Sequence, residues 1–184
     1  MDDMPVYLFT GFLESGKTSF IDETLADKRF NNGQRTLLLV CEEGEAEYDE
    51  SRPYMKNIYV ENIEDEDELT SETLDILAKK HRASRVLIEY NGMWQMEKLY
   101  REVLPANWVL YQIMTFVHAP TFELFVKNMG QLMMEKITNA DMIVFNRCDN
   151  KLKESLRARN LRMVNRRADI YLEAVSYTHL TLPT

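Results

Sequence analysis

The residues best suited to chemistry in this chain are Gly11-Phe-Leu-Glu-Ser-Gly-Lys-Thr18, which have the types and spacing of a phosphate-binding loop. Gly11 and Gly16 allow the backbone to wrap closely around a phosphate, with its amides pointing inward. Lys17 is predicted to reach the β- and γ-phosphates of a bound nucleotide and to be catalytic. The hydroxyl of Thr18 is predicted to bind Mg²⁺.

Three further residues of this loop are expected to touch the nucleotide. The backbone amides of residues 14–18, which include Glu14 and Ser15, are predicted to point toward the phosphates. Ser19 is placed to contact the α-phosphate. The predicted phosphate contacts are therefore Gly11, Glu14, Ser15, Gly16, Lys17, Thr18 and Ser19.

Magnesium between two phosphates needs a second anchor, and Glu89 is the candidate. It ends the apolar run Val86-Leu-Ile88 and is followed by Tyr-Asn-Gly92, so the chain can approach a γ-phosphate at Gly92. We predict that Glu89 is linked to the metal and is catalytic. The alternative is a solvated acid at the end of a strand.

A third motif, Asn146-Arg-Cys-Asp149, follows the apolar run Ile143-Val-Phe145 and indicates recognition of the base. A carboxylate at Asp149 can accept hydrogen bonds from the N1–H and the exocyclic amine of guanine, which adenine cannot supply. Arg147 can lie over the base with its aliphatic stem, and Asn146 completes the motif. A polar loop in which Asp149 only caps the next helix is the alternative.

The elements that must position these motifs alternate between apolar runs and helical segments. Helical spacing is predicted for residues 17–28 and for a helix through Leu69, Leu74, Leu77 and Ala78. This alternation predicts a doubly wound α/β fold, a mostly parallel sheet with helices on both faces, and the glycine-loop motif makes it a fold of the P-loop NTPase type. The predicted strands are residues 6–10, 36–41, 57–60, 85–90, 109–117 and 141–146.

Residues 1–175 are predicted to form one GTP-binding domain, a length that can bury a sizeable core. Residues 176–184 are rich in Thr, lack charge and fit no element of this pattern. We interpret them as an irregular segment, a foreign tail after a C-terminal truncation, with a frayed natural terminus as the alternative.

Composition narrows the classes of partner. The net charge of −8 argues against general binding to nucleic acid or to an anionic membrane, since both depend on clustered Lys and Arg. The acidic N-terminus resembles neither a secretory signal nor a membrane span, which predicts a cytoplasmic protein. Cys41 and Cys148 are expected to be reduced thiols.

Taken together, the three motifs and the acidic segment Glu42-Glu-Gly-Glu45 resemble the CobW-type metallochaperone GTPases, relatives of UreG and HypB. The resemblance runs from about Pro5 to Val175. It implies that Glu89 is the magnesium-linked acid and that Glu42, Gly44 and Glu45 belong to the first switch segment. It also implies slow GTP hydrolysis coupled to metal delivery, a client metalloprotein, and a GTP-dependent homodimer.

The chain departs from the family pattern in three places. The signature Cys-x-Cys-Cys, which would hold a metal such as zinc or cobalt, is missing from residues 46–85. Glu14 replaces a small residue, and His118 stands where the family tends to have Asp. Two other functions therefore stay open: a nucleotide-dependent binding module that does not hydrolyse GTP, and an ATP-using P-loop kinase or ATPase.

Overall fold

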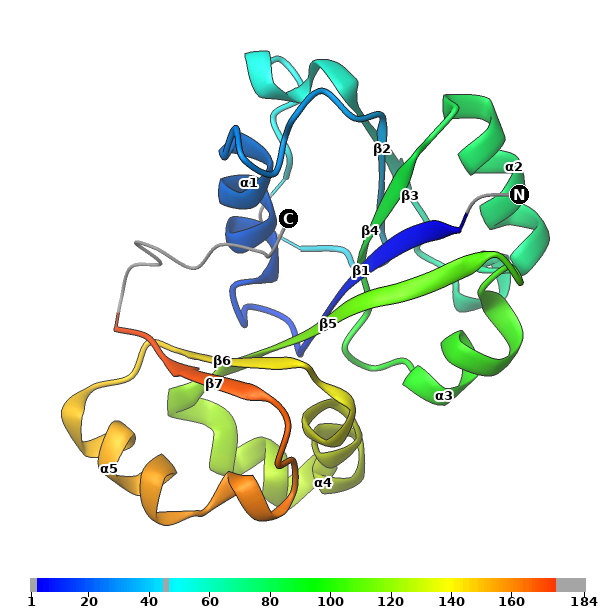
Figure 1. The fold of residues 1–184 in the computed structure, drawn as a ribbon. Helices are drawn as coiled ribbons and strands as arrows, with labels where there is room; N and C mark the ends of the chain where they lie inside the picture. Colours follow the sequence, from blue (N-terminus) through cyan, green and yellow to red (C-terminus); the bar gives the residue numbers. More distant parts are fainter. Residues whose placement is uncertain (1–2, 45–46, 175–184) are drawn as a thin grey trace.

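The computed structural model describes residues 3–44 and 47–174, and within them seven strands form a single parallel sheet. The order of the strands is β3-β2-β4-β1-β5-β6-β7, so β1 lies near the middle of the sheet (Figure 1). The strands are β1 (Met4–Thr10), β2 (Thr36–Val40), β3 (Ile58–Asn62), β4 (Arg85–Glu89), β5 (Trp108–His118), β6 (Met142–Asn146) and β7 (Asp169–Leu172).

Helices connect the strands, as parallel pairing requires. The α-helices are α1 (Lys17–Ala26), α2 (Ser71–His81), α3 (Met96–Lys98), α4 (Phe122–Asn139) and α5 (Asn150–Ala158). Short turns of other helix types are η1 (Pro53–Asn57), η2 (Glu66–Glu68), η3 (Leu99–Val103), η4 (Ala119–Thr121) and η5 (Leu161–Met163).

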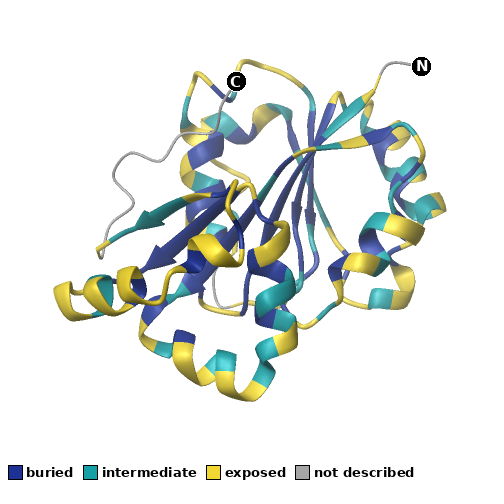
Figure 2. Ribbon diagram, turned by 60° about the horizontal axis from the view of Figure 1, so that its bottom comes forward, coloured by how far each residue is buried: buried dark blue, intermediate teal, exposed yellow. Residues whose placement is uncertain are grey.

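The core lies on both faces of the sheet, because alternate residues of each strand point to opposite sides. On one face, Val6 and Leu8 of β1 pack with α2 and α3, while Ile143 and Phe145 of β6 pack with α4 and α5. On the other face, Phe9 packs against α1. Figure 2 accordingly shows the central strands mostly buried, the edge strand β7 half-buried, and the outward sides of the helices exposed.

The structure confirms the predicted α/β fold and makes the sheet entirely parallel over the described residues. The first predicted helix ends at Ala26 instead of Lys28, because the backbone of Asp27 is extended. Leu69 precedes the second helix, which begins at Ser71 after Thr70 caps it by accepting a hydrogen bond from the amide of Thr73. The strand β7 was not predicted, and the segment 176–184 lies outside the described residues.

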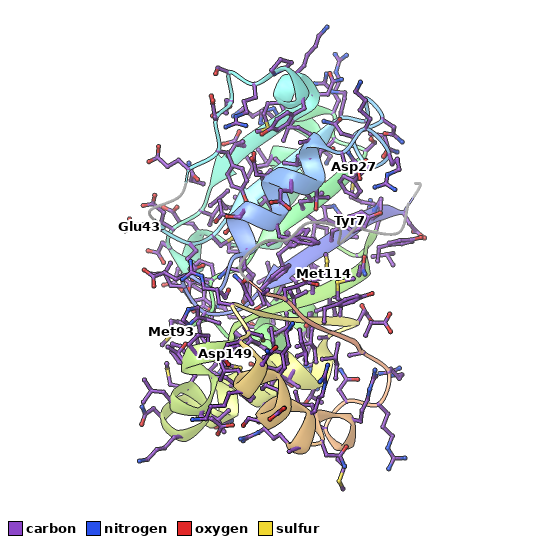
Figure 3. The ribbon with its side chains drawn as sticks, turned by 90° about the vertical axis from the view of Figure 1, so that its left-hand side faces the viewer. Tyr7, Asp27, Glu43, Met93, Met114 and Asp149 are labelled. Atoms are coloured by element: carbon purple, nitrogen blue, oxygen red, sulfur yellow. The ribbon has the colours of Figure 1, made fainter. Side chains whose placement is uncertain are left out.

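The carboxyl ends of the parallel strands meet at one edge of the sheet, where ligands bind in folds of this kind. Figure 3 shows Glu43, Met93 and Asp149, which follow β2, β4 and β6, toward one side of the molecule. Asp27, at the far end of α1, lies toward the other side. Among the described residues, no helix combines the length and the apolar character needed to cross a membrane.

Candidate nucleotide-binding site

The loop between β1 and α1 has the backbone geometry that the glycine spacing predicts. Gly11 has φ of 140° and Gly16 has φ of 99°, values that residues with a side chain rarely adopt. A Cβ atom at Gly11 would lie 2.2 Å from the carbonyl oxygen of Phe116 on β5. Gly16 directly precedes α1, so the N-terminal amides of that helix open toward the loop.

A cavity of about 310 Å³ lies at this edge of the sheet, over the loop and the first turn of α1. It gathers residues from the ends of β2, β4 and β6 as well as from the loop itself. Its lining is Leu13, Glu14, Ser15, Gly16, Lys17, Thr18, Ser19, Val40, Glu42, Gly44, Glu89 and Arg147. Most residues predicted from the three motifs and the acidic segment therefore share one cavity.

The remaining predicted residues are not part of this lining. Gly11 and Gly92 are buried behind it, and a Cβ atom at Gly92 would lie 2.4 Å from the carbonyl oxygen of Gly11. The loop after β4 thus packs directly on the loop after β1. Asn146 is buried, Asp149 is exposed, and Glu45 lies outside the described residues.

Lys17 is buried at the floor of the cavity, with 3% of its surface exposed. Its Nζ donates to the carbonyl oxygens of Gly11 at 2.6 Å and Phe12 at 3.0 Å. It also forms an ion pair with Oε2 of Glu42 at 2.6 Å. These contacts fix the ammonium group beside the loop amides, where a phosphate oxygen would be attracted.

Glu89 lies at the end of β4, is 3% exposed, and uses both oxygens of its carboxylate. Thr18 donates from Oγ1 to Oε1 at 2.5 Å, and Tyr48 donates from its hydroxyl to Oε2 at 2.6 Å. The two residues predicted to anchor magnesium are therefore joined directly. Both groups are hard oxygen donors, the kind that suits Mg²⁺.

Tyr48 is a site residue that the sequence did not reveal. Burial, and then the neighbouring Glu89 carboxylate, hold the pKa of Tyr48 well above its usual value. Its phenol consequently remains a hydrogen-bond donor at neutral pH. The only signal in the sequence is one aromatic residue in an acidic loop, which by itself indicates nothing about a metal site.

Glu42 joins three segments of the site. Besides its ion pair with Lys17, its Oε1 accepts from the backbone amide of Gly92 at 3.4 Å. Its side chain is 10% exposed, whereas Glu43 beside it is exposed. The acidic segment after β2 is thus linked to both the loop after β1 and the loop after β4.

The side chains of Asn146 and Arg147 in the base motif make longer contacts than Lys17 and Thr18 in the phosphate-binding loop. The Nδ2 of Asn146 lies 3.5 Å from the carbonyl oxygen of Ser15, which links the end of β6 to the phosphate-binding loop. Arg147 is exposed, has a positive φ of 58°, and its Nη1 lies 3.5 Å from Nε2 of His118. Burial, and then the Arg147 cation, lower the pKa of His118, so its ring is neutral at pH 7.

Asp149 makes the helix cap that the sequence left as the alternative. Its Oδ1 accepts from the amide of Leu152 at 2.7 Å at the start of α5. Glu14 is exposed, its φ of 61° lies in the left-handed region, and it lines the same cavity as Lys17 and Thr18.

The thiols are not arranged as metal ligands. Cys41 is buried, and burial followed by the charges of Glu89 and Glu42 raises its pKa to about 12. Burial also raises the pKa of Cys148. Over residues 3–44 and 47–174, no three His, Cys, Asp or Glu side chains are grouped so that they could hold a metal ion.

This fold and this cavity define a P-loop nucleotide-binding domain. A family model for the nucleotide-binding domain of CobW, HypB and UreG matches residues 5–171, and the chain belongs to that family. It is also similar to the zinc-regulated GTPase metalloprotein activator 1 of Schizosaccharomyces pombe, with 25% identity over 175 residues. That match covers 85% of this chain and 42% of the relative.

Two solved structures have the same fold. The Zn(II)-bound YjiA GTPase from E. coli superposes with a TM-score of 0.66 at 23% identity, covering 100% of this chain and 60% of that one. The hydrogenase maturation factor HypB from Archaeoglobus fulgidus superposes with a TM-score of 0.61 at 19% identity. That match covers 93% of this chain and 81% of HypB.

Proposed function

We propose that this domain binds GTP and GDP together with Mg²⁺, hydrolyses GTP slowly, and uses the loops after β2 and β4 as a switch. The observation that supports this most is the convergence of Lys17, Thr18 and Glu89 on one cavity beside the glycine loop. The relatives support a GTPase role, because one is named a zinc-regulated GTPase metalloprotein activator and another a GTPase.

Each phosphate-side residue has a distinct task. Lys17 neutralises charge on the β- and γ-phosphates, and the amides at the start of α1 bind phosphate oxygens. Thr18 and Glu89 are the residues that would hold the magnesium ion, which would neutralise negative charge on the phosphates. Oε1 of Glu89 accepts the hydroxyl proton of Thr18, which leaves the lone pairs of that hydroxyl available to a metal ion.

Guanine is the base that the third motif favours. Asn146 holds the motif close to the phosphate-binding loop, and Arg147 lines the cavity with its long side chain. The Asp149 carboxylate would accept from the guanine N1–H and amine. Its Oδ1 already caps α5, so base recognition depends on the rest of that carboxylate.

A role in metal delivery or metallocofactor assembly is proposed from the relatives. The chain spans 42% of the length of the fission yeast protein, so the client metalloprotein and a GTP-dependent homodimer are proposals for the whole protein. Zinc or cobalt as cargo is proposed from the family resemblance alone. The chain itself offers no Cys-x-Cys-Cys ligands for such a metal in residues 46–85. A cytoplasmic location belongs to the same proposal.

The test is equilibrium binding of fluorescent GDP with unlabelled GTP, GDP and ATP as competitors, with and without Mg²⁺, followed by single-turnover phosphate release. We expect guanine nucleotides to compete well, ATP to compete poorly, and Mg²⁺ to tighten binding. Stronger competition by ATP would assign the domain to the ATP-using class. Tight GTP binding without phosphate release would identify a binding module.

A further inference from the structure

The carboxylate of Glu42 occupies an unusual place, between the two kinds of donor that recognise a terminal phosphate. Its Oε2 pairs with Lys17 Nζ at 2.6 Å, and its Oε1 accepts from the amide of Gly92 at 3.4 Å. Glu42 also lines the cavity formed by the phosphate-binding loop. One side chain therefore connects the phosphate lysine with the loop after β4.

A carboxylate resembles the end of a phosphate chain in the properties that these donors recognise. Both are anionic and both present several oxygens that accept from an ammonium group and a backbone amide. The pair is well shielded, with side-chain exposures of 2% for Lys17 and 10% for Glu42. In such surroundings charge-assisted hydrogen bonds are stronger than at an open surface.

We propose that Glu42 is an internal mimic of the γ-phosphate, occupying the position of that group whenever no triphosphate is bound. This inference rests on the proposed function, because it assumes that the cavity takes a guanine nucleotide. GDP leaves the Glu42 position free: its β-phosphate takes the place of one of the two carbonyl oxygens that accept from Lys17 Nζ, and the ion pair with Glu42 is kept. GTP brings a phosphate into competition with Glu42 for Lys17 and for the amide of Gly92.

The contacts of Gly92 indicate whether the loop after β4 or the segment after β2 moves when a triphosphate binds. A Cβ atom at Gly92 would lie 2.4 Å from the carbonyl oxygen of Gly11 and 2.7 Å from the Cα of Phe12. The loop after β4 is thus packed tightly against the phosphate-binding loop. Glu42 must leave instead, so the segment after β2 is the one released by GTP.

Glu42 therefore sets the preference between GTP and GDP. Displacing it costs the ion pair, a cost that applies to GTP and not to GDP. Removing its charge should improve binding of a triphosphate while affecting a diphosphate little. Glu43 offers a matched control, because it is the next residue, carries the same charge and is exposed to solvent.

The experiment measures dissociation constants for GDP and for a non-hydrolysable β,γ-imido analogue of GTP, by displacement of fluorescent GDP at fixed Mg²⁺. The proteins are the wild type, Glu42→Gln and Glu43→Gln. For Glu42→Gln we expect affinity for the analogue to rise about tenfold, as expected for loss of one competing charge-assisted contact, with GDP changing less than about twofold. Glu43→Gln should leave the ratio of the two affinities unchanged.

Thermal unfolding of each variant checks that it is folded. Glu42→Asp keeps the charge beside Lys17, and its shorter side chain cannot span both donors, so it should raise the ratio by about threefold. An unchanged ratio, or an equal gain for both nucleotides, would overturn the inference and leave the proposed function standing. Failure of the wild type to bind any guanine nucleotide would overturn both.

Discussion

The two ends of the candidate site are built very differently. At the phosphate end, Lys17 and Glu89 are each 3% exposed, and the charged groups of Lys17, Glu42 and Glu89 have partners at 2.5 to 3.0 Å. At the base end, Arg147 and Asp149 are exposed, and the side-chain contacts of Asn146 with Ser15 and of Arg147 with His118 are 3.5 Å long.

This difference separates affinity from selectivity. Shielded charges with fixed partners are preorganised, and they contribute much more to binding than exposed ones. We infer that the phosphate end supplies most of the affinity for a nucleotide, whereas the base end adds a smaller preference between bases. Variants at the two ends should accordingly differ in both the size and the kind of their effect.

The largest effect is expected at the phosphate end, from Lys17→Ala. Removing the ammonium group should weaken GDP and GTP binding by about 100-fold, because a shielded charge-assisted contact to phosphate is lost. Calorimetric titration with GDP measures it. The change also leaves the largely shielded carboxylate of Glu42 without its cation, so the stability of the variant must be measured alongside.

A double variant separates these two causes. Lys17→Ala with Glu42→Gln removes the uncompensated carboxylate, so it should recover stability without recovering nucleotide affinity. If the double variant regained tight nucleotide binding, the phosphate role of Lys17 would be wrong. The inference that the phosphate end supplies most of the affinity would then be wrong as well.

The second effect concerns magnesium at the same end. Glu89→Gln keeps the size of the side chain but removes its charge, and it should reduce the gain in GDP affinity caused by Mg²⁺ about tenfold. Affinity measured in EDTA should stay within about twofold of the wild type, since the phosphate contacts of the loop are kept. An equal loss with and without Mg²⁺ would indicate general damage to the loop.

At the base end, Asp149→Asn should lower the ratio of GTP to ATP affinity by only about fivefold, the size expected for an exposed hydrogen bond to a charged acceptor. Asn still caps α5 well through its side-chain oxygen, so stability should hardly change. Asp149→Ala, which removes both functions, should also lose about 1 kcal/mol of stability. Nucleotide competition and thermal unfolding distinguish the two roles, and a 100-fold fall in the ratio would contradict the inferred asymmetry.

Much of the fold could be predicted because its strands are continuous apolar runs, as in Leu37-Leu-Leu39 and Val86-Leu-Ile88, which are fully buried. The strand β7 escaped prediction because it is four residues long, begins with an exposed Asp169 and lies at the edge of the sheet. A half-buried edge strand carries a weaker hydrophobic signal than a central one.

Part of the candidate site could likewise be predicted from the sequence, and part could not. The glycine loop was predictable because its backbone geometry requires particular residue types at fixed spacing. The contacts of Glu42 with Lys17 and Gly92 depend on how three distant segments meet, which spacing along the chain does not encode. Tyr48 escaped for that reason, since its partner Glu89 is 41 residues away.

Tyr48 also gives the smallest and sharpest test of the phosphate end. Tyr48→Phe removes the hydroxyl that holds Oε2 of Glu89, so the carboxylate should be less well positioned and the Mg²⁺-dependent gain in GDP affinity should fall about threefold. Tyr54→Phe is the matched control, because its hydroxyl donates to another carboxylate, Asp22, at 2.7 Å. It should leave that gain unchanged.

The pH dependence sharpens this last comparison. Because the pKa of Tyr48 is raised well above 10.0, its phenol stays protonated and keeps donating through the neutral and mildly alkaline range. The difference between wild type and Tyr48→Phe should therefore be constant from about pH 6 to 9. Titration of Mg²⁺ against the GDP complex at several pH values measures it. A difference that vanished as the pH rose within that range would mean that the Tyr48 phenol loses its proton there, contrary to its buried place beside Glu89. Equal losses in the Tyr48 and Tyr54 variants would instead make Tyr48 a packing residue of the loop.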